Sequence, residues 1–235
     1  MSVNIEIFCD FDGTITKQDT IDLLLERIGE KSWLEYEKLW LEGKIGSREC
    51  MSKQIPLLQG GFKNIIKVLE EVKIDETFKD FIYWCNKHEI KLTVVSDGLD
   101  RIINYLFFRE KIKLDNIIAN KLIELPENKL AMASPYAKTN CLSGVCKCSV
   151  INNTVKHKIA IGDGQSDFCF AKEANVVFAK SKLEIYLKEN NYKYYPFSNF
   201  NDIKETLENL YINPVNNNEC YTVDEVEIMS NSVLQ

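Results

Sequence analysis

Short apolar runs alternate with amphipathic stretches along most of the chain. Runs rich in β-branched residues predict buried strands at 3–9, 91–95, 158–161 and 175–179. Apolar positions at helical spacing predict helices at 21–28, 33–40, 62–69, 78–85, 102–107, 182–190 and 200–211. One or two further short strands are expected within 115–133, around a turn at Pro126. Strands that alternate with helices predict an α/β fold, with a mostly parallel sheet covered by helices on both faces.

The alternation breaks once, directly after the first strand. The stretch of about 14–87 is almost entirely helical in pattern. We therefore predict an α/β core built from 1–13 and 88–212, with a helical cap domain at 14–87 inserted after the first strand. Residues 213–235 are rich in Asn and in acidic residues and contain no Lys or Arg, so we expect a loosely attached C-terminal tail.

Small and acidic residues cluster where three of the predicted strands end. The clusters are Asp10-Phe11-Asp12-Gly13, Ser96-Asp97-Gly98 and Gly162-Asp163-Gly164, with Asp167 shortly after the last. In open α/β sheets, ligands bind beyond the carboxyl ends of the strands, so these clusters are expected to converge. Converging carboxylates repel one another unless a hard divalent cation such as Mg²⁺ lies between them. The sequence therefore predicts a Mg²⁺ site with the candidate ligands Asp10, Asp12, Asp163 and Asp167.

This arrangement favours phosphoryl chemistry. A carboxylate beside a bound cation can attack phosphorus and form an aspartyl-phosphate, and a second carboxyl group two residues further on can protonate the leaving oxygen and later activate water. Asp10 and Asp12 have that spacing. Ser96 and the backbone amides after it can hold phosphate oxygens, and a lysine would neutralise the charge of the transition state. A single Asp-x-Asp is often only a turn or a helix N-cap, but three such strand ends weigh against coincidence.

Composition and charge narrow the class of protein. The 235 residues are 45% hydrophobic and 27% charged with a net charge of -6, which is typical of a folded soluble protein and argues against a general nucleic-acid binder. No apolar run approaches the ~18–20 residues of a membrane helix, and no secretory signal is visible. We therefore expect a cytoplasmic protein with mostly reduced cysteines. Zinc binding by Cys141, Cys146 and Cys148, near His157, is an alternative, although the spacing is not a standard one.

Three motifs carry a resemblance to a known family. DFDGTIT at 10–16, VVSDG at 94–98 and IGDGQSD at 161–167 resemble the motifs of the haloacid dehalogenase superfamily of phosphohydrolases. The resemblance covers most of residues 3–180. It implies a Rossmann-like core with a cap that closes over a small phosphorylated metabolite.

The resemblance also implies roles for the acidic residues. Asp10 would be the nucleophile and Asp12 the general acid/base, with Mg²⁺ bound by Asp10, the backbone carbonyl of Asp12 and Asp163. Asp167 would support this site or bind the ion itself. The expected contacts to phosphate and substrate are Ser96, Asp97, Gly98, Asp19 and Gln54.

The family mechanism further implies a lysine near the carboxylates, and the sequence offers three candidates: Lys147, Lys156 and Lys158. Lys158 opens a predicted strand and therefore lies at the end of that strand remote from the site. Lys147 precedes a short helical stretch, from which its side chain can reach the cleft. We favour Lys147, and the other two stay open as alternatives.

The inserted helices resemble the phosphoserine phosphatase-like branch of the superfamily. Within that branch, SDGLDRII at 96–103, CxxxxCKC at 141–148 and WLEGKIGSRECMSKQ at 40–54 are more similar to the 2-hydroxy-3-keto-5-methylthiopentenyl-1-phosphate phosphatases of methionine salvage. That group usually reads CKPS at the lysine, so Cys148 stands where a proline is expected.

The cap residues bear on the substrate. Phosphoserine phosphatases bind the substrate amine through a cap carboxylate and its carboxylate through a cap arginine. Asp19 lies where the cap carboxylate would be and Gln54 near the place of the arginine, with Asp22 and Arg48 as further candidates. Because glutamine cannot form a charged bidentate clamp, we expect a neutral, sugar-like or keto-enol phosphate. A phosphoserine phosphatase-like enzyme, a phosphotransferase and a catalytically idle binding protein are the alternatives, and the sequence is compatible with a monomer or a homodimer.

Overall fold

The computed structural model describes residues 4–213, so nearly all of the tail predicted at 213–235 lies outside the described residues. Within them, one sheet has the strand order β4-β3-β2-β1-β5-β6-β7. Its strands are β1 (Ile5–Cys9), β2 (Lys91–Leu99), β3 (Ile117–Leu125), β4 (Lys129–Ala133), β5 (His157–Gly162), β6 (Val176–Ala179) and β7 (Tyr195–Pro196). All neighbouring strands run parallel except β3 and β4. The predicted α/β fold with a mostly parallel sheet is confirmed.

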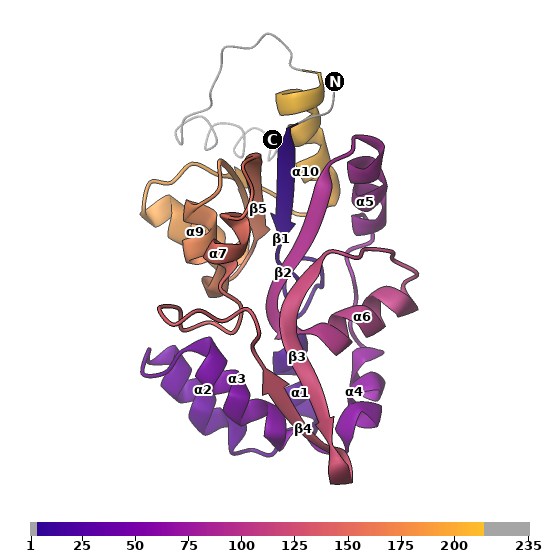
Figure 1. The fold of residues 1–235 in the computed structure, drawn as a ribbon, viewed down its shortest axis with the longest axis vertical. Coiled ribbons are helices and arrows are strands. Elements are labelled where there is room, and N and C mark those ends of the chain that lie inside the picture. Colours follow the sequence, from indigo (N-terminus) through magenta and orange to yellow (C-terminus); the bar gives the residue numbers. More distant parts are fainter. Residues whose placement is uncertain (1–3, 214–235) are drawn as a thin grey trace, which may run out of the picture.

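Helices cover both faces of this sheet, as Figure 1 shows for α5 and α6 on one side and α7 and α9 on the other. The core helices are α5 (Phe78–Lys87), α6 (Asp100–Arg109), α7 (Lys147–Ile151), α8 (Phe168–Lys172), α9 (Ser181–Glu189) and α10 (Phe200–Leu207). Successive side chains of β1 point to opposite faces: Ile7 packs in the cluster with Phe78 and Phe200, and Phe8 in the cluster with Phe170. Burial on both faces explains why the central parts of β1, β2 and β5 are mostly apolar.

The inserted helices lie beyond the carboxyl ends of the strands. They are α1 (Thr20–Ile28), α2 (Trp33–Leu41), α3 (Ser47–Gln54), the 3-10 turn Ile55–Leu57 and α4 (Gly61–Leu69). The antiparallel hairpin of β3 and β4 reaches down to them, and β4 packs against α3 and α4 (Figure 1). The cap is therefore supported by a strand pair from the core.

The last helix of the stretch expected to form the cap, α5, packs on the sheet. It contacts β2 and α10. The rings of Phe78 and Phe81 lie 4.8 and 5.2 Å from the ring of Phe200, and Trp84 Nε1 donates a hydrogen bond of 2.8 Å to Glu208. The apolar side of α5 thus packs in the α/β core and not in the cap.

Among the elements that differ from the sequence-based expectation, such as the unpredicted strand β7, two lie near the carboxylate clusters and the cap. Helix α3 was not predicted, because its residues SRECMSKQ carry no apolar stripe and bury only Cys50 and Gln54. Strand β2 continues past the predicted end at 95 to Leu99, so Ser96, Asp97 and Gly98 form its carboxyl end. No helix within residues 4–213 is long and apolar enough to cross a bilayer.

Candidate active site

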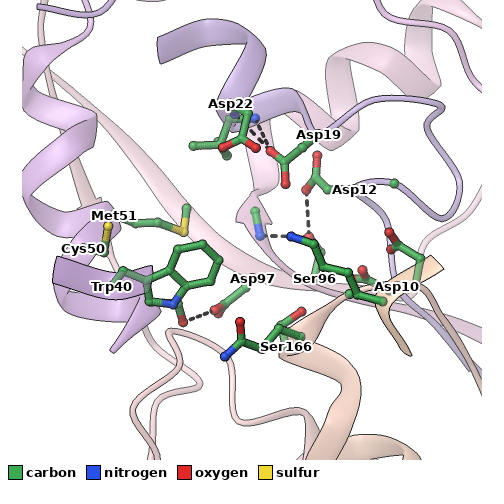
Figure 2. A pocket seen from close by; sticks show the side chains of 18 of the residues that line it. Asp10, Asp12, Asp19, Asp22, Trp40, Cys50, Met51, Ser96, Asp97 and Ser166 are labelled. Carbon is green, nitrogen blue, oxygen red and sulfur yellow. Dashed lines mark hydrogen bonds between the residues drawn. The ribbon is translucent and has the colours of Figure 1, made fainter. Parts of the chain in front are cut away.

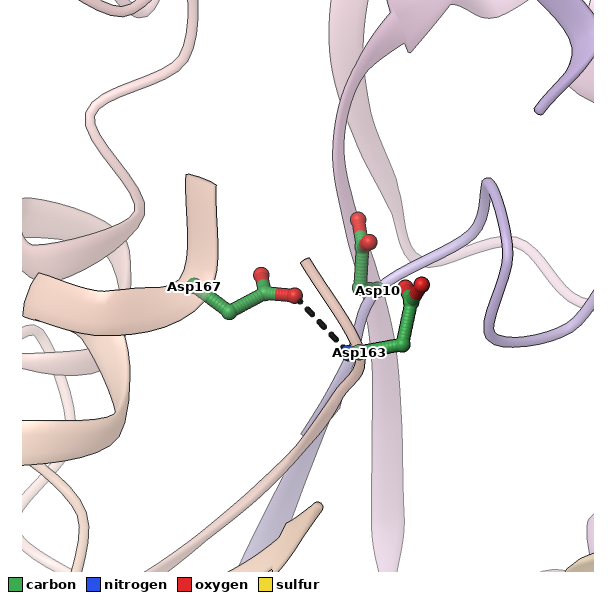
Figure 3. Close-up of side chains that lie close together, drawn as sticks. All are labelled: Asp10, Asp163 and Asp167. Carbon is green, nitrogen blue, oxygen red and sulfur yellow. Dashed lines mark hydrogen bonds between the residues drawn. The ribbon is translucent and has the colours of Figure 1, made fainter. Parts of the chain in front are cut away.

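Three carboxylates meet where β1 and β5 end. Asp10 follows β1, and its backbone N–H donates to Ile161 of β5 at 2.9 Å. Asp163 follows β5, and a short turn brings Asp167 back so that its Oδ2 accepts from the backbone N–H of Asp163 and Gly164, each at 3.1 Å. Carboxylate oxygens of Asp10, Asp163 and Asp167 all lie within 4.8 Å of one another (Figure 3). Three hard oxygen donors at this spacing suit a Mg²⁺ ion.

The carboxylate of Asp12, also a candidate ligand from the sequence, is not part of this group. Its Oδ1 accepts hydrogen bonds from the backbone N–H and the hydroxyl of Thr20, at 2.9 and 2.5 Å. Burial, followed by the charge of Asp19, raises the pKa of Asp12 to about 7, although the Thr20 hydrogen bonds oppose the shift. Asp12 is therefore placed to exchange a proton near neutral pH rather than to bind a cation through its side chain.

Lys147 joins the acidic group from the first position of α7. Its Nζ lies 2.6 Å from Asp10 Oδ1 and 2.6 Å from Asp167 Oδ1, and the side chain is 2% exposed. Burial disfavours the charged ammonium, but the two carboxylates outweigh it and raise the lysine pKa above its ordinary value. Lys158, by contrast, donates to Asn152 at 2.8 Å, away from the carboxylates. Of the three candidate lysines, the structure brings Lys147 to the site.

Burial, then the charge of Asp167, raises the pKa of Asp10 well above its ordinary value, against the opposing effect of Lys147. The pKa of Asp163 rises to about 6 for the same two reasons. Thr14 partly offsets this, because its hydroxyl donates to Asp163 Oδ1 at 2.9 Å. The negative charges of these carboxylates are therefore only partly compensated by the surrounding protein groups. Such an excess of negative charge favours the binding of a cation.

Two glycines allow the loops to approach this closely. Gly13 has a φ of 74°, and a Cβ there would lie 2.5 Å from Asp163 Oδ2. A Cβ on Gly98 would lie 2.5 Å from Asp12 Oδ2. Ser96 Oγ donates to that same oxygen at 3.4 Å and accepts from the Gly98 N–H at 2.8 Å. Larger residues would push the strand ends apart.

A cavity of about 460 Å³ lies between these residues and the inserted helices (Figure 2). Asp10, Asp12, Ser96 and Gly98 line its floor, and Ile21, Trp40, Leu41 and Met51 line its apolar part. The predicted contacts Asp19, Asp22, Asp97 and Gln54 also line it, whereas Arg48 does not. Asp19 has a second role as N-cap of α1, since its Oδ1 accepts from the backbone N–H of Ile21 and Asp22.

Sequence reasoning missed other lining residues, among them Glu37, Trp40, Ser47 and Lys182. Gln54 Nε2 donates to Glu37 Oε2 at 3.0 Å. The Gln54 amide, which stands near the place of the arginine in phosphoserine phosphatases, therefore orients the carboxylate of Glu37. Ser47 donates to Asp97 Oδ2 at 2.5 Å, and the Val145 N–H donates to Asp97 Oδ1 at 2.7 Å. Asp97 thus joins the cap to the loop before α7. The apolar spacing of α2 indicates a helix but not which of its residues face a cavity.

The cysteines do not form a metal-ligand group among the described residues, where Asp10, Asp163 and Asp167 are the set with suitable spacing. His157, considered as a zinc ligand with Cys141, Cys146 and Cys148, lies against the ring of Tyr211 at 5.6 Å. The zinc alternative gains no support from this geometry.

The sequence matches a known protein family over most of its length. The sequence model described as haloacid dehalogenase-like hydrolase matches residues 7–172, which include both carboxylate loops and the lysine. The chain belongs to the haloacid dehalogenase-like hydrolases. The resemblance expected from the three motifs is confirmed.

The proteins to which this chain is similar include phosphatases. A 2-hydroxy-3-keto-5-methylthiopentenyl-1-phosphate phosphatase of Bacillus cereus is 31% identical over 218 residues, which cover 88% of this chain and 98% of the relative. Among solved structures, a substrate-bound phosphoserine phosphatase complex has a TM-score of 0.67 and 22% identity, over 86% of this chain and 97% of that one. A phospho-aspartyl intermediate analogue of phosphoserine phosphatase has a TM-score of 0.67 and 23% identity, over 88% and 99%. At these identities the two structures establish a shared fold.

Proposed function

We propose that this chain is a Mg²⁺-dependent phosphatase that hydrolyses a small phosphorylated metabolite through an aspartyl-phosphate on Asp10. The observation that carries the proposal is the buried ammonium of Lys147, held 2.6 Å from both Asp10 and Asp167, of which Asp10 lines the floor of the cavity. Buried and paired charges in a cleft are a common feature of catalytic sites, where fixed charges stabilise the charge that develops in the transition state. A cytoplasmic location, and a monomer or homodimer, stay predictions.

The first step follows from the placement of Asp10. A carboxylate oxygen of Asp10 attacks phosphorus, a P–O bond forms, and the ester bond to the leaving oxygen breaks. Lys147 holds the Asp10 side chain in position and neutralises negative charge, while Ser96 Oγ at the cavity floor can hold a phosphate oxygen. Mg²⁺ bound by Asp10, Asp163 and Asp167 would supply further charge neutralisation at the phosphate oxygens.

Asp12 serves both steps as acid and then base. A protonated Asp12 gives its proton to the leaving oxygen, and the resulting carboxylate takes a proton from the water that hydrolyses the aspartyl-phosphate. Its pKa of about 7 keeps both forms accessible at neutral pH. The hydrogen bonds from Thr20 fix the side chain between Asp10 and the cap.

We predict that Asp12→Asn lowers kcat/KM for an alkyl phosphate by about a hundredfold to ten-thousandfold, because the amide cannot donate the proton. The wild-type kcat/KM for the same substrate should fall as the pH rises above about 7, where Asp12 loses its proton, and the variant should lack this dependence. Steady-state kinetics from pH 5 to 9 measure both effects.

The internal control is the leaving group. p-Nitrophenolate departs without protonation, so kcat/KM for p-nitrophenyl phosphate should fall much less in Asp12→Asn than kcat/KM for the alkyl phosphate. Equal losses on the two substrates would remove the acid role from Asp12.

The cavity wall favours a substrate without a carboxylate. Asp19, Asp22 and Glu37 line it, and the Gln54 amide is used by Glu37. Burial, then the charge of Asp19, raises the pKa of Asp22 to about 7, because several carboxyl groups lie close together in this wall. Lys17 and Lys182 also line the cavity, but the acidic residues outnumber them, so the carboxylate of phosphoserine would meet mainly like charges, whereas an uncharged tail fits the apolar part of the cavity. We therefore propose a keto-enol phosphate of the kind named for the Bacillus cereus relative.

The test of the function is a comparison of substrates. The chain should hydrolyse p-nitrophenyl phosphate in Mg²⁺ and lose that activity in excess chelator, and kcat/KM should be higher for the keto-enol phosphate than for O-phosphoserine. A preference for phosphoserine would contradict the substrate class. Transfer of phosphate to added alcohols in place of release would assign a phosphotransferase, and no turnover of any phosphomonoester would leave a binding protein.

A further inference from the structure

Two thiols outside the reaction machinery lie in contact at the surface of the core. Cys148 Sγ and Cys169 Sγ are 2.7 Å apart. Cys148 is partly exposed and Cys169 exposed, whereas Cys9, Cys50, Cys85 and Cys146 are buried. The contact joins the second residue of α7 to the second residue of α8. A dissolved oxidant can therefore reach this pair directly.

Two groups of the acidic site lie at the starts of the same two helices, Lys147 as the first residue of α7 and Asp167 as the N-cap of α8. Lys147 directly precedes Cys148, and Asp167 lies two residues before Cys169. The helices pack against each other, and Asn152 Nδ2 donates to Glu173 Oε2 at 2.8 Å where they end. The thiol pair thus joins the two helices within two residues of Lys147 and Asp167, whose side chains share a hydrogen bond of 2.6 Å.

We propose that Cys148 and Cys169 form an oxidisable dithiol, which a peroxide closes to a disulfide that lowers the activity of the enzyme. This proposal rests on the proposed function for its effect on activity, and on the thiol geometry alone for its chemistry. It concerns a pair that no step of the hydrolysis uses.

The chemistry needs one two-electron oxidant. The sulfur of one cysteine attacks a peroxide oxygen, so that an S–O bond forms, the O–O bond breaks and, with hydrogen peroxide, one water leaves. The second sulfur then attacks the first, the S–S bond forms, the S–O bond breaks, and a second water leaves. Two thiols and one hydrogen peroxide thus give one disulfide and two waters. A dithiol reductant reverses the change by two exchange steps.

Closure has a consequence for Lys147. The two sulfurs must approach from 2.7 Å to a bonded distance of about 2.05 Å, which draws the first turns of α7 and α8 together. Lys147 is held between two carboxylates by hydrogen bonds of 2.6 Å, so a shift of its helix changes that geometry. Misplacement of a positioning group by a fraction of an ångström is expected to cost about tenfold in rate.

The experiment compares the reduced and the peroxide-treated full chain in wild type, Cys148→Ser and Cys169→Ser. Cys141→Ser is the matched control, because Cys141 is a partly exposed thiol of the loop before α7 and lies outside the pair. After free thiols are alkylated, peptide mass mapping identifies any cross-link, and p-nitrophenyl phosphate turnover in Mg²⁺ is measured on the same samples.

We expect a cross-link between the peptides of Cys148 and Cys169, with the loss of two hydrogens, in wild type and in Cys141→Ser. The activity of both should fall about tenfold and return with dithiothreitol. Cys148→Ser and Cys169→Ser should keep their activity in peroxide.

A cross-link to another cysteine, a cross-linked enzyme with full activity, or inactivation of Cys148→Ser to the wild-type extent would each overturn the proposal. Absence of hydrolysis by the reduced wild-type chain would overturn the proposed function instead, because the cross-link is identified by mass without any turnover.

Discussion

Asp10→Asn is expected to abolish hydrolysis of phosphomonoesters, with a loss of at least about a thousandfold in kcat/KM. The amide of asparagine is too weak a nucleophile to attack phosphorus, so the variant cannot form the aspartyl-phosphate. The fold should persist, because the asparagine oxygen can still accept the hydrogen bond from Lys147 and because burial and Asp167 already disfavour the charge on Asp10. Kinetics with p-nitrophenyl phosphate and thermal melts monitored by circular dichroism measure the two effects.

The matched control is Asp80→Asn, which removes the same charge from an exposed position on α5 outside the cavity lining. It should leave turnover unchanged. Acid quenching after mixing with labelled substrate should trap phosphate on the wild type and on Asp80→Asn but not on Asp10→Asn. Strong turnover by Asp10→Asn would assign the nucleophile to another residue.

The strands and the acidic floor could be predicted from the sequence because each depends on local pattern and on simple topology. β1 and β5 are buried on both faces over most of their length, so their sequences are apolar apart from Glu6 in β1 and His157 and Lys158 at the start of β5. They are parallel neighbours, so the residues after them, Asp10 and Asp163, had to meet at one edge. The antiparallel pairing of β3 and β4 was not evident, since the turn at Pro126 alone does not specify a partner strand.

The cap was harder to predict. α3 has a polar sequence and is positioned by long-range contacts, such as the Ser47 hydrogen bond to Asp97 and the Arg48 N–H that donates to Leu142. Without α3, the cavity-facing roles of Ser47 and Glu37 could not be deduced. The choice among three lysines had the same limit, because it depends on how the loop before α7 brings Lys147 to the carboxylates of Asp10 and Asp167.

Lys147→Met tests both the assignment of the lysine at the site and the electrostatics of the site. It leaves the carboxylates of Asp10 and Asp167 without their buried cation, so we expect a loss of about a hundredfold to a thousandfold in kcat/KM. The free energy of unfolding of the metal-free protein should fall by about 3–5 kcal/mol at pH 8, the usual cost of removing one partner from a buried ion pair. Urea denaturation measured with chelator present gives this value.

The loss of stability should depend on pH in a definite direction. The pKa of Asp10 is raised in the folded protein even with Lys147 present, and removing the lysine raises it further. The folded variant then binds more protons than the unfolded chain, so its stability is greatest at low pH and falls as the pH rises through the folded pKa. We expect Lys147→Met to be much less destabilised at pH 5 than at pH 8.

Lys158→Met is the matched control, since Lys158 was an alternative candidate and its ammonium contacts Asn152. It should keep its activity and show no such dependence on pH. If Lys158→Met lost its activity while Lys147→Met kept it, the assignment of the lysine would be wrong. An equal loss of stability by Lys147→Met at both pH values would indicate damaged packing, because a gap in the core costs the same free energy whether or not the carboxylates carry protons.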